Sequence, residues 1–244
     1  MIVLKVAAAT HRGWVRNENQ DRLVAGSWIL GPDAPSPVEL VCLPNPQLVA
    51  VLDGMGGHVS GGTASTLAAE VLSASPAVTS TDDLAALAAK ANEAVYRRMT
   101  DQPTLNGMGS TIVGLCVLQD ELAVFNIGDS RAYQLTDGYL IQLSEDDAAP
   151  NGLLTASLGG RSSYEEVSLH VARVAVDVSV RILLASDGLF GHVPIEELER
   201  QIDPDLLTSV ARLMSLALDA GGPDNVTVAM VDAAVVANGE KGGT

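Results

Sequence analysis

Single aspartates at five separated places along the chain are the residues best suited to do chemistry. In three of these places an aliphatic run leads to, or follows from, one carboxylate that lies beside glycine or proline. Folds use this arrangement to place carboxylates at the end of a sheet, where they converge on a hard divalent cation. One Asp-Gly pair is only a turn signal, but five acidic motifs with an arginine upstream predict a metal site. The residues are Asp21, Asp53, Asp129, Asp187 and Asp224, with Arg16 upstream.

Strand ends must position the central carboxylates. Asp53 and Asp187 each follow a run of aliphatic residues, and Asp224 precedes another run. If the strands of Asp187 and Asp224 are neighbours, the two carboxylates converge without long, flexible side chains. Gly54, with the glycines that follow it, lets the backbone turn sharply and brings a carbonyl oxygen close to whatever Asp53 holds.

The composition predicts one domain with a large aliphatic core. Hydrophobic residues make up 47% of the 244 residues, but aromatic residues only 3%, so Ala, Val, Leu and Ile must fill the interior. No linker or shift in composition divides the chain, which favours a single domain over residues 1–233 and a flexible tail over 234–244. The net charge of −16 argues against nucleic acid or an anionic membrane surface as a partner.

The cysteines and the apolar runs indicate a cytoplasmic protein. Cys42 and Cys116 lie in apolar runs without metal-ligand spacing, which is typical of buried free thiols. The first residues are too short and wrongly flanked for a signal peptide. No apolar run reaches the length of about 18 residues that a membrane-spanning helix needs.

Short β-rich runs dominate the chain, one of them at residues 22–30, and helical periodicity occurs in two separated pairs. The helices are expected at residues 62–72, 82–99, 194–201 and 204–219, with a proline at the first position of the last two. This order is no regular βαβ alternation, so the sequence predicts an α+β fold in which two antiparallel sheets are flanked by helix pairs. Residues 136–138 predict a hairpin turn, and residues 31–37 a mobile loop.

Seven motifs in the same order resemble the type 2C, metal-dependent (PPM) family of protein serine/threonine phosphatases in its bacterial form. The similarity spans residues 10–231 and is carried by residues 13–21, the run at Asp53, and residues 61–65, 108–111, 128–131, 186–188 and 224–227. Such an ordered set is far more specific than one short pattern. It implies a four-layer α-β-β-α sandwich as the fold. It also implies that the chain is a phosphoprotein phosphatase.

The resemblance assigns metal ligands residue by residue. It implies that Asp53 bridges two metals, that the carbonyl oxygen of Gly54 is a ligand, and that Asp187 and Asp224 complete the first metal site. Gln20 and Asp21 then belong to the second metal. Gln20 stands where many relatives have glutamate, so a neutral oxygen replaces a charged one. Oxygen ligands alone favour Mn²⁺ or Mg²⁺ over Zn²⁺, with two or three ions bound.

The remaining assignments from the resemblance concern the substrate and a third ion. Arg16 matches the family's phosphate-binding arginine, whose guanidinium presents two parallel donors to a phosphoryl group. Asp146 is implied to help hold the third metal with Asp187. His58 is a candidate proton donor to the leaving oxygen, although a hydrogen-bonded loop histidine is an equally good interpretation. Asn225 is expected to orient Asp224.

Other residues in the matched region carry different expectations. The turn at residues 129–131 is expected to be structural and fixed by an internal ion pair. The segment from Asp147 to residue 158 is about twenty residues shorter than in typical members of the family. In the family that segment is the flap beside the active site, so the chain departs from the family in the region that bears on substrate selection and the third metal.

The resemblance implies hydrolysis of phosphoserine or phosphothreonine by direct attack of a hydroxide held between two metals. The partner would be a phosphorylated protein, either the target or the autophosphorylated form of a serine/threonine kinase. Two alternatives stay open. Gln20, Asp147 and the short flap are compatible with a phosphatase fold that binds a phosphoprotein or kinase without turnover. The same chemistry could also act on a phosphorylated anti-sigma antagonist.

Overall fold

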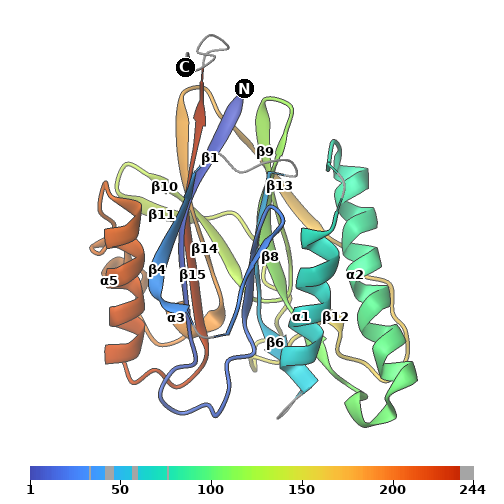
Figure 1. The fold of residues 1–244 in the computed structure, drawn as a ribbon. Helices are drawn as coiled ribbons and strands as arrows, with labels where there is room; N and C mark the ends of the chain where they lie inside the picture. The colour runs from blue at the N-terminus through green and yellow to red at the C-terminus, as the bar shows by residue number, and fades with distance from the viewer. Residues whose placement is uncertain (33, 42–46, 57–59, 76, 237–244) are drawn as a thin grey trace, which may run out of the picture.

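The computed structural model describes residues 1–32, 34–41, 47–56, 60–75 and 77–236. Four layers are visible in Figure 1: two sheets face each other, α1 and α2 cover the outer face of one, and α5 covers the outer face of the other. This is the α-β-β-α sandwich that the sequence predicts. The start of β1 lies at one end of the sandwich, and α3 and β6 lie at the opposite end (Figure 1).

The first sheet has six strands in the order β11-β10-β14-β15-β1-β4, and every neighbouring pair is antiparallel. Its strands are β1 (Ile2–His11), β4 (Ala34–Val41), β10 (Arg131–Thr136), β11 (Tyr139–Gln142), β14 (Ser179–Ala185) and β15 (Val226–Val235). Antiparallel pairing of β14 with β15 brings the end of the first strand beside the start of the second. The residues that follow β14 and those that precede β15 therefore lie side by side at the same end of the sheet.

The second sheet also has six antiparallel strands, in the order β13-β9-β8-β5-β2-β3, and a small sheet has the order β12-β7-β6. The strands are β2 (Arg22–Ala25), β3 (Trp28–Leu30), β5 (Leu48–Leu52), β8 (Ile112–Leu118), β9 (Glu121–Ile127) and β13 (His170–Ala175), with β6 (Gly54–Met55), β7 (Gly109–Ser110) and β12 (Leu158–Gly159). The small sheet continues directly from β5 through Asp53, so it extends the fold at that end.

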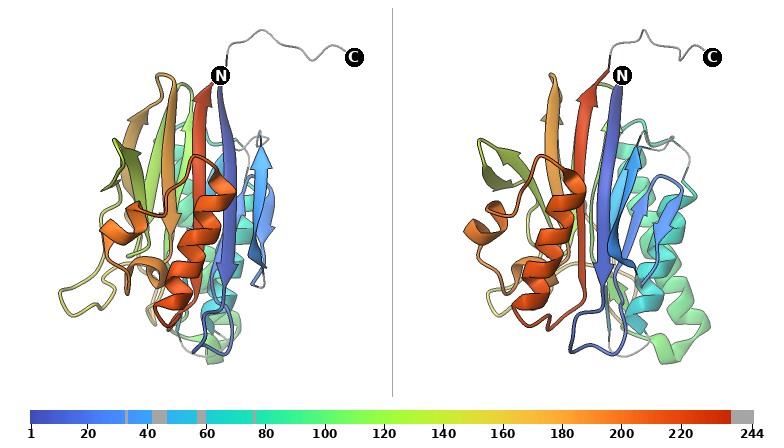
Figure 2. Two further views of the ribbon diagram at one scale, coloured as in Figure 1. Left: turned by 90° about the vertical axis from the view of Figure 1, so that its left-hand side faces the viewer. Right: turned by 60° about the vertical axis from the view of Figure 1, so that its left-hand side comes forward.

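The helices lie close to the predicted ranges, with one addition. They are α1 (Ser60–Ser73), α2 (Thr81–Asp101), α3 (Asp187–Phe190), α4 (Ile195–Glu199) and α5 (Leu206–Asp219), with a short 3₁₀ turn η1 (Pro103–Leu105). Ser80 and Asp83 form a capping box that fixes the start of α2. The two views in Figure 2 show α5 lying along the sheet that contains β1 and β15.

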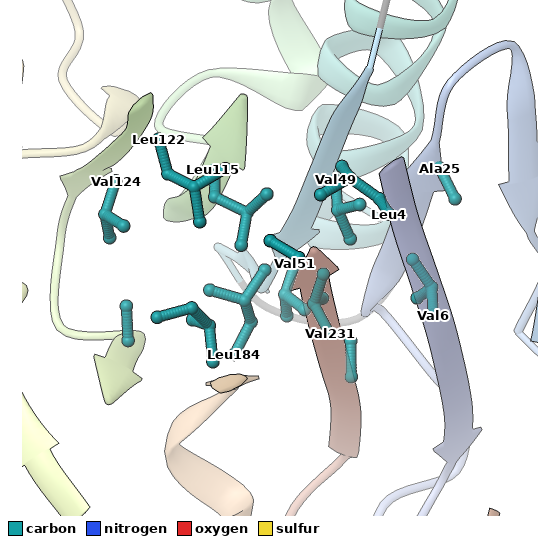
Figure 3. Close-up of a cluster of buried hydrophobic side chains, with 14 of the residues drawn as sticks. Leu4, Val6, Ala25, Val49, Val51, Leu115, Leu122, Val124, Leu184 and Val231 are labelled. Carbon is teal, nitrogen blue, oxygen red and sulfur yellow. The ribbon is translucent and has the colours of Figure 1, made fainter. Parts of the chain in front are cut away.

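The core is aliphatic, as the low aromatic content requires. Figure 3 shows side chains from both sheets interdigitating, including Leu4, Val49 and Val231. A second cluster joins α1 and α2 to their sheet, and a third joins α5 to the other sheet. Cys116 is buried in the second cluster as a free cysteine, and burial raises the pKa of its thiol to about 12. Cys42 lies outside the described residues.

Four local expectations differ from the structure. Residues 34–37 are not loop but the first half of β4, which pairs with β1. The single β run expected at residues 22–30 is a hairpin, β2 and β3. Neither proline is at the first helical position: Pro194 is the N-cap of α4, and Pro204 lies before Asp205, which is the N-cap of α5. β15 continues to Val235, so the strand includes the first two residues of the expected tail.

Two further features bear on the sequence expectations. The hairpin at residues 136–138 forms as predicted, with positive φ at Asp137 and Gly138. None of the helices in the described ranges is long and apolar enough to cross a membrane.

Candidate metal and phosphate site

A cavity of about 490 Å³ opens where the ends of β5 and β14 meet the start of β15. Most of the residues that the sequence predicts for the site line this cavity. They are Arg16, Gln20, Asp53, Gly54, Asp187, Asp224 and Asn225. Asp21 lies in the buried neighbourhood of these groups, whereas Asp146 is not among the lining residues. His58 lies outside the described residues, and its role stays a prediction.

Gly54 lies where two backbone segments approach each other closely. A Cβ atom at Gly61, in the first turn of α1, would lie 2.6 Å from the carbonyl oxygen of Gly54 and closer still to Oε1 of Gln20. The two oxygens therefore converge on one small space that only glycine leaves open. Ser65 Oγ donates to the carbonyl oxygen of Gln20 at 2.5 Å and ties this turn to α1. The geometry is compatible with both predicted neutral ligands.

Asp21 is fully buried, and one half of its carboxylate is firmly held. Ser186 Oγ and Thr227 Oγ1 donate to Asp21 Oδ2 at 2.8 and 2.7 Å. Oδ1 has no hydrogen-bond partner. Burial raises the pKa of Asp21 to about 7, and the two hydroxyl donors partly oppose that rise. An unpartnered buried carboxylate oxygen is costly unless a cation or a proton satisfies it.

The other carboxylates of the cavity repel one another. Burial raises the pKa of Asp53 well above its usual range, and the charges of Asp21, Asp187 and Asp224 add to the rise. Burial and the charge of Asp224 likewise raise the pKa of Asp187, whose Oδ1 also lacks a hydrogen-bond partner. A divalent cation would stabilise the ionised forms of these three acidic groups, Asp21, Asp53 and Asp187, beside the charge of Asp224.

Nevertheless, the described residues contain no group of three or more His, Cys, Asp or Glu side chains already arranged to hold an ion. Asp224 is engaged by donors of the protein itself. Its Oδ2 accepts from Arg16 Nη2 at 2.5 Å and its Oδ1 accepts from the backbone N–H of Asn225 at 2.8 Å. Both oxygens thus have donors. The unpartnered buried oxygens of Asp21 and Asp187 are the atoms that a cation would satisfy, whereas Asp224 already has as its partner Arg16, whose side chain is 57% exposed.

The loop that carries Arg16 is fixed against the segment of Asp224 by close backbone packing. Gly13 has a φ of +76°, and a Cβ atom there would overlap the carbonyl oxygens of Gly222 and Asp224. The N–H of Trp14 donates to the carbonyl oxygen of Gly222 at 2.7 Å. Arg16 is therefore held beside the carboxylates although most of its side chain is exposed.

Asn225 does more than the sequence suggested. Its backbone N–H contacts Asp224, but its side chain binds the loop of Arg16 instead. Nδ2 donates to the carbonyl oxygens of Arg12 and Glu18, both at 2.9 Å, and Oδ1 accepts from the N–H of Gln20 at 2.8 Å. One amide thus ties the predicted phosphate-binding and metal-binding segments together.

Asp129, which the sequence analysis treats as a structural turn residue, lines the cavity. Burial raises its pKa to about 6, and the charge of Asp187 contributes. The expected ion pair at this turn forms with another partner: Arg131 binds the carboxylate of Asp146 through Nε at 2.9 Å and Nη2 at 2.6 Å. A signal for Asp129 was present, because it follows a buried strand and a glycine, as Asp53 follows β5.

Asp146 has its oxygens engaged by side-chain donors. Besides Arg131, Gln142 Nε2 donates to Oδ1 at 2.8 Å. Arg131 also stacks over the ring of Phe190 in α3, with 4.4 Å from Cζ to the ring centroid. Asp146 therefore supports the wall of the site from outside the cavity. Its predicted role at a third metal stays a prediction, and the position of Asp129 offers a competing candidate.

The shortened segment after Asp147 still reaches the cavity. Its base is closed because the N–H of Asp147 donates to the carbonyl oxygen of Gly128 at 3.0 Å, and the N–H of Thr155 to that of Asp147 at 2.8 Å. The tip, Gly152 to Leu154, contributes to the cavity lining. The site is thus bordered on this side although the longer flap is missing.

Comparison with known proteins identifies the family. Residues 39–228 match the model of the family described as protein phosphatase 2C. The chain is 32% identical to the serine/threonine protein phosphatase PstP of Mycobacterium tuberculosis, over 95% of this chain but 45% of that protein. It is 30% identical to the serine/threonine phosphatase stp of Listeria monocytogenes, over 91% of this chain and 93% of that protein.

Two solved structures are similar over nearly their whole length. The crystal structure of the catalytic domain of PstP in complex with two manganese ions has a TM-score of 0.78 at 32% identity, covering 96% of this chain and 100% of that one. PppA, a regulatory component of the type VI secretion system in Pseudomonas aeruginosa, also has a TM-score of 0.78, at 30% identity, covering 95% of this chain and 99% of that one. The chain belongs to the protein phosphatase 2C family.

Proposed function

We propose that this protein is a metal-dependent protein serine/threonine phosphatase that hydrolyses phosphoserine and phosphothreonine in other proteins. The observation that carries the proposal is one cavity in which an arginine adjoins acidic groups with unpartnered buried oxygens. Such a cavity suits a phosphoryl group and divalent cations together. The activity of the relatives PstP and stp, as their names state it, supports the same assignment.

The residues that would hold Mn²⁺ or Mg²⁺ are the carboxylates of this region together with the two neutral oxygen donors. Asp53, Asp187 and Asp224 would take one ion with the carbonyl oxygen of Gly54, and Asp21 and Gln20 a second. PstP binds two manganese ions in its crystal structure. When bound, such ions would supply an acidified water and positive charge beside the phosphorus. Asp129 with Asp187 is the best-placed pair for a third ion, since both line the cavity and their charges interact.

The chain's own residues then position the phosphate. Arg16 would exchange its bond to Asp224 for the phosphoryl oxygens, to which its guanidinium offers two parallel donors. In-line hydrolysis also needs the charge on the phosphoryl group to be neutralised. If Asp224 held a cation, Arg16 would lose its present partner and could bind the phosphoryl oxygens instead. The exposed side of the cavity leaves room for a protein segment, so the substrate is a phosphoprotein.

The proposed partner is a phosphoprotein connected with a serine/threonine kinase. A phosphatase of this class reverses a serine/threonine kinase, and either the kinase's target or its autophosphorylated form has the required phosphoamino acid. His58 is proposed as a proton donor to the leaving serine or threonine oxygen, because an imidazole titrates near neutrality.

Hydrolysis of a phosphothreonine peptide with Mn²⁺ and with EDTA tests the proposal. Activity should require the metal and should be lost in Asp53→Asn, while the fold is retained by circular dichroism. Activity that persists after exhaustive chelation would contradict the metal-dependent mechanism. No turnover with any metal would favour the alternative of a binding protein.

A further inference from the structure

Two exposed aliphatic side chains stand on the rim of the catalytic cavity. Val15 is 69% exposed and Leu153 is 66% exposed, and both line the cavity of Arg16 and Asp53. A single exposed valine or leucine on a surface means little. These two differ because they come from loops 138 positions apart in the sequence and border the same opening.

Both side chains are held on fixed loops. Val15 follows Trp14, whose N–H and indole Nε1 donate to the carbonyl oxygens of Gly222 and Leu218 at 2.7 and 3.1 Å. Leu153 lies in a tight turn in which the N–H of Ala149 donates to its carbonyl oxygen at 2.8 Å. Because hydrogen bonds fix both loops, the exposed side chains of Val15 and Leu153 have defined positions.

The position of the phosphate decides what would cover this surface. A phosphoryl group must reach Arg16 and the carboxylates inside the cavity, so the residues before and after the phosphorylated residue must cross the rim. Covering exposed aliphatic surface is favourable. Charge offers a competing attraction, because Glu18 also lines the cavity as a carboxylate that accepts from Gln20 Nε2 at 2.7 Å, so a peptide with basic flanking residues is the alternative that the test must include.

We infer that Val15 and Leu153 form an apolar clamp for the substrate chain, and that the protein selects phosphoserine and phosphothreonine sites flanked by aliphatic residues. This inference rests on the proposed function, because it uses the same cavity. It names the class of substrate: a phosphorylated segment with Val, Leu or Ile beside the phosphoresidue, as opposed to a strongly basic or acidic one.

Three phosphothreonine peptides that differ only in the flanking residues test the clamp: leucine, glycine or arginine on both sides. With Mn²⁺, kcat/KM for the leucine peptide should exceed that for the glycine peptide by about tenfold, as burial of aliphatic surface predicts. The difference should lie mainly in KM. In Val15→Ser and Leu153→Ser the ratio between the two peptides should fall towards one.

Val178→Ser and Ile141→Ser are matched controls. These side chains are 76% and 53% exposed but do not line the cavity, so the wild-type ratio should be retained. Calorimetric binding of the same peptides with a non-hydrolysable phosphonate in place of phosphate gives a readout that needs no turnover. Equal affinities for the leucine and glycine peptides, or tighter binding of the arginine peptide, would overturn the clamp. Absence of hydrolysis together with the expected affinity order would overturn the proposed enzyme and leave the clamp supported.

Discussion

At the scale of single residues, the site is made of carboxylates that differ in how they are satisfied. Asp224 is bonded to Arg16, Asp21 has one free oxygen, and Asp129 has a pKa raised to about 6 by burial. Asp146 lies outside the cavity lining, and its two oxygens accept from Arg131 and Gln142. From this difference we assign Asp129 to the metal site and Asp146 to the support of the cavity wall.

Asp129→Asn and Asp146→Ala should therefore have opposite effects. Asp129→Asn should lower peptide turnover at least tenfold, since it removes an oxygen ligand candidate from the cavity, and leave the free energy of unfolding unchanged or higher. Asp146→Ala should lower that free energy by about 1–2 kcal/mol, because a partly exposed charged pair is broken, with turnover largely retained. Peptide kinetics and urea denaturation measure both quantities. Loss of turnover in Asp146→Ala at full stability would restore Asp146 to the third metal.

Arg16 is the residue expected to bind the phosphoryl group directly. Arg16→Ala should lower kcat/KM by about ten- to a hundredfold, since a charged bidentate contact contributes roughly 1.5–3 kcal/mol. Arg16→Lys should recover little, because an ammonium lacks the two parallel donors. Steady-state kinetics on a phosphothreonine peptide decides the matter, with Arg12→Ala, a neighbour outside the cavity, as the control. An unchanged kcat/KM in Arg16→Ala would remove the residue from the site.

The sequence predicted these residues with uneven success, for a physical reason. Asp53, Asp187 and Asp224 each adjoin a strand and a glycine or proline, so their positions at a sheet end follow from local chain geometry. Asp129 has the same local signature, but its role depends on which side of the turn faces the cavity. The same turn is tied to the rest of the fold by Arg131, which pairs with Asp146 fifteen residues away, a contact that no local pattern reveals.

At the scale of elements, three strand ends hold the second predicted metal site together. Thr10 of β1, Ser186 after β14 and Thr227 of β15 form one hydroxyl network around Asp21. Thr10 Oγ1 lies 2.7 Å from Thr227 Oγ1, and the N–H of Thr227 donates to Ser186 Oγ at 2.9 Å. The network fixes Asp21 Oδ2 and leaves Oδ1 for a cation.

Thr227→Val should separate this positioning role from general stability. Valine keeps the shape and the β preference but removes the hydroxyl, so Asp21 loses one donor and can rotate. Calorimetric titration should show Mn²⁺ affinity lowered about tenfold, as loss of one hydrogen bond to a charged group predicts. Thr227→Ser should rescue most of the affinity. Thr208→Val, at the exposed start of α5, is the control. Wild-type affinity in Thr227→Val would show that packing alone holds Asp21.

Elements set by long-range pairing were those that the sequence did not predict. β5 and α5 follow from clear local periodicity. β4 includes Pro35 and Pro37, which argue against a strand, but it is an edge strand paired only with β1, where proline is tolerated. The single turn of α3 has four residues, which is too short for a periodicity to detect.

At the scale of the whole molecule, two six-stranded sheets provide a rigid frame, and one of its ends concentrates negative charge. The net charge of −16 adds to the mutual repulsion of the carboxylates in the cavity. The aliphatic core between the sheets does not include the residues of the site, so we expect the fold to withstand this repulsion when no metal is bound (Figure 3). Stability and metal binding should therefore be linked through pH.

Without metal, the protein should lose stability as the pH rises from 5 to 8. The pKa values of Asp21 and Asp129 are raised to about 7 and about 6 in the folded state, from 3.8. A group with a raised pKa binds its proton more tightly when folded. Its stabilising contribution is therefore complete below the unfolded pKa and is lost as the pH passes through the folded value. Mn²⁺ should reverse the trend, since it binds the ionised carboxylates of the folded state only.

Thermal unfolding of the same protein in EDTA and in Mn²⁺ at pH 5, 6, 7 and 8 measures this linkage. The difference in Tm between the two conditions should be small at pH 5 and largest at pH 8, because protons compete with the metal at low pH. Asp21→Asn has no titrating group at that position, so its Tm in EDTA should fall less steeply with pH. Glu196→Gln, on the exposed surface of α4, should follow the wild type. A metal-free protein that gains stability between pH 5 and 8 would show that the buried carboxylates are not protonated when the ions are removed, and that another cation or a rearranged loop satisfies them.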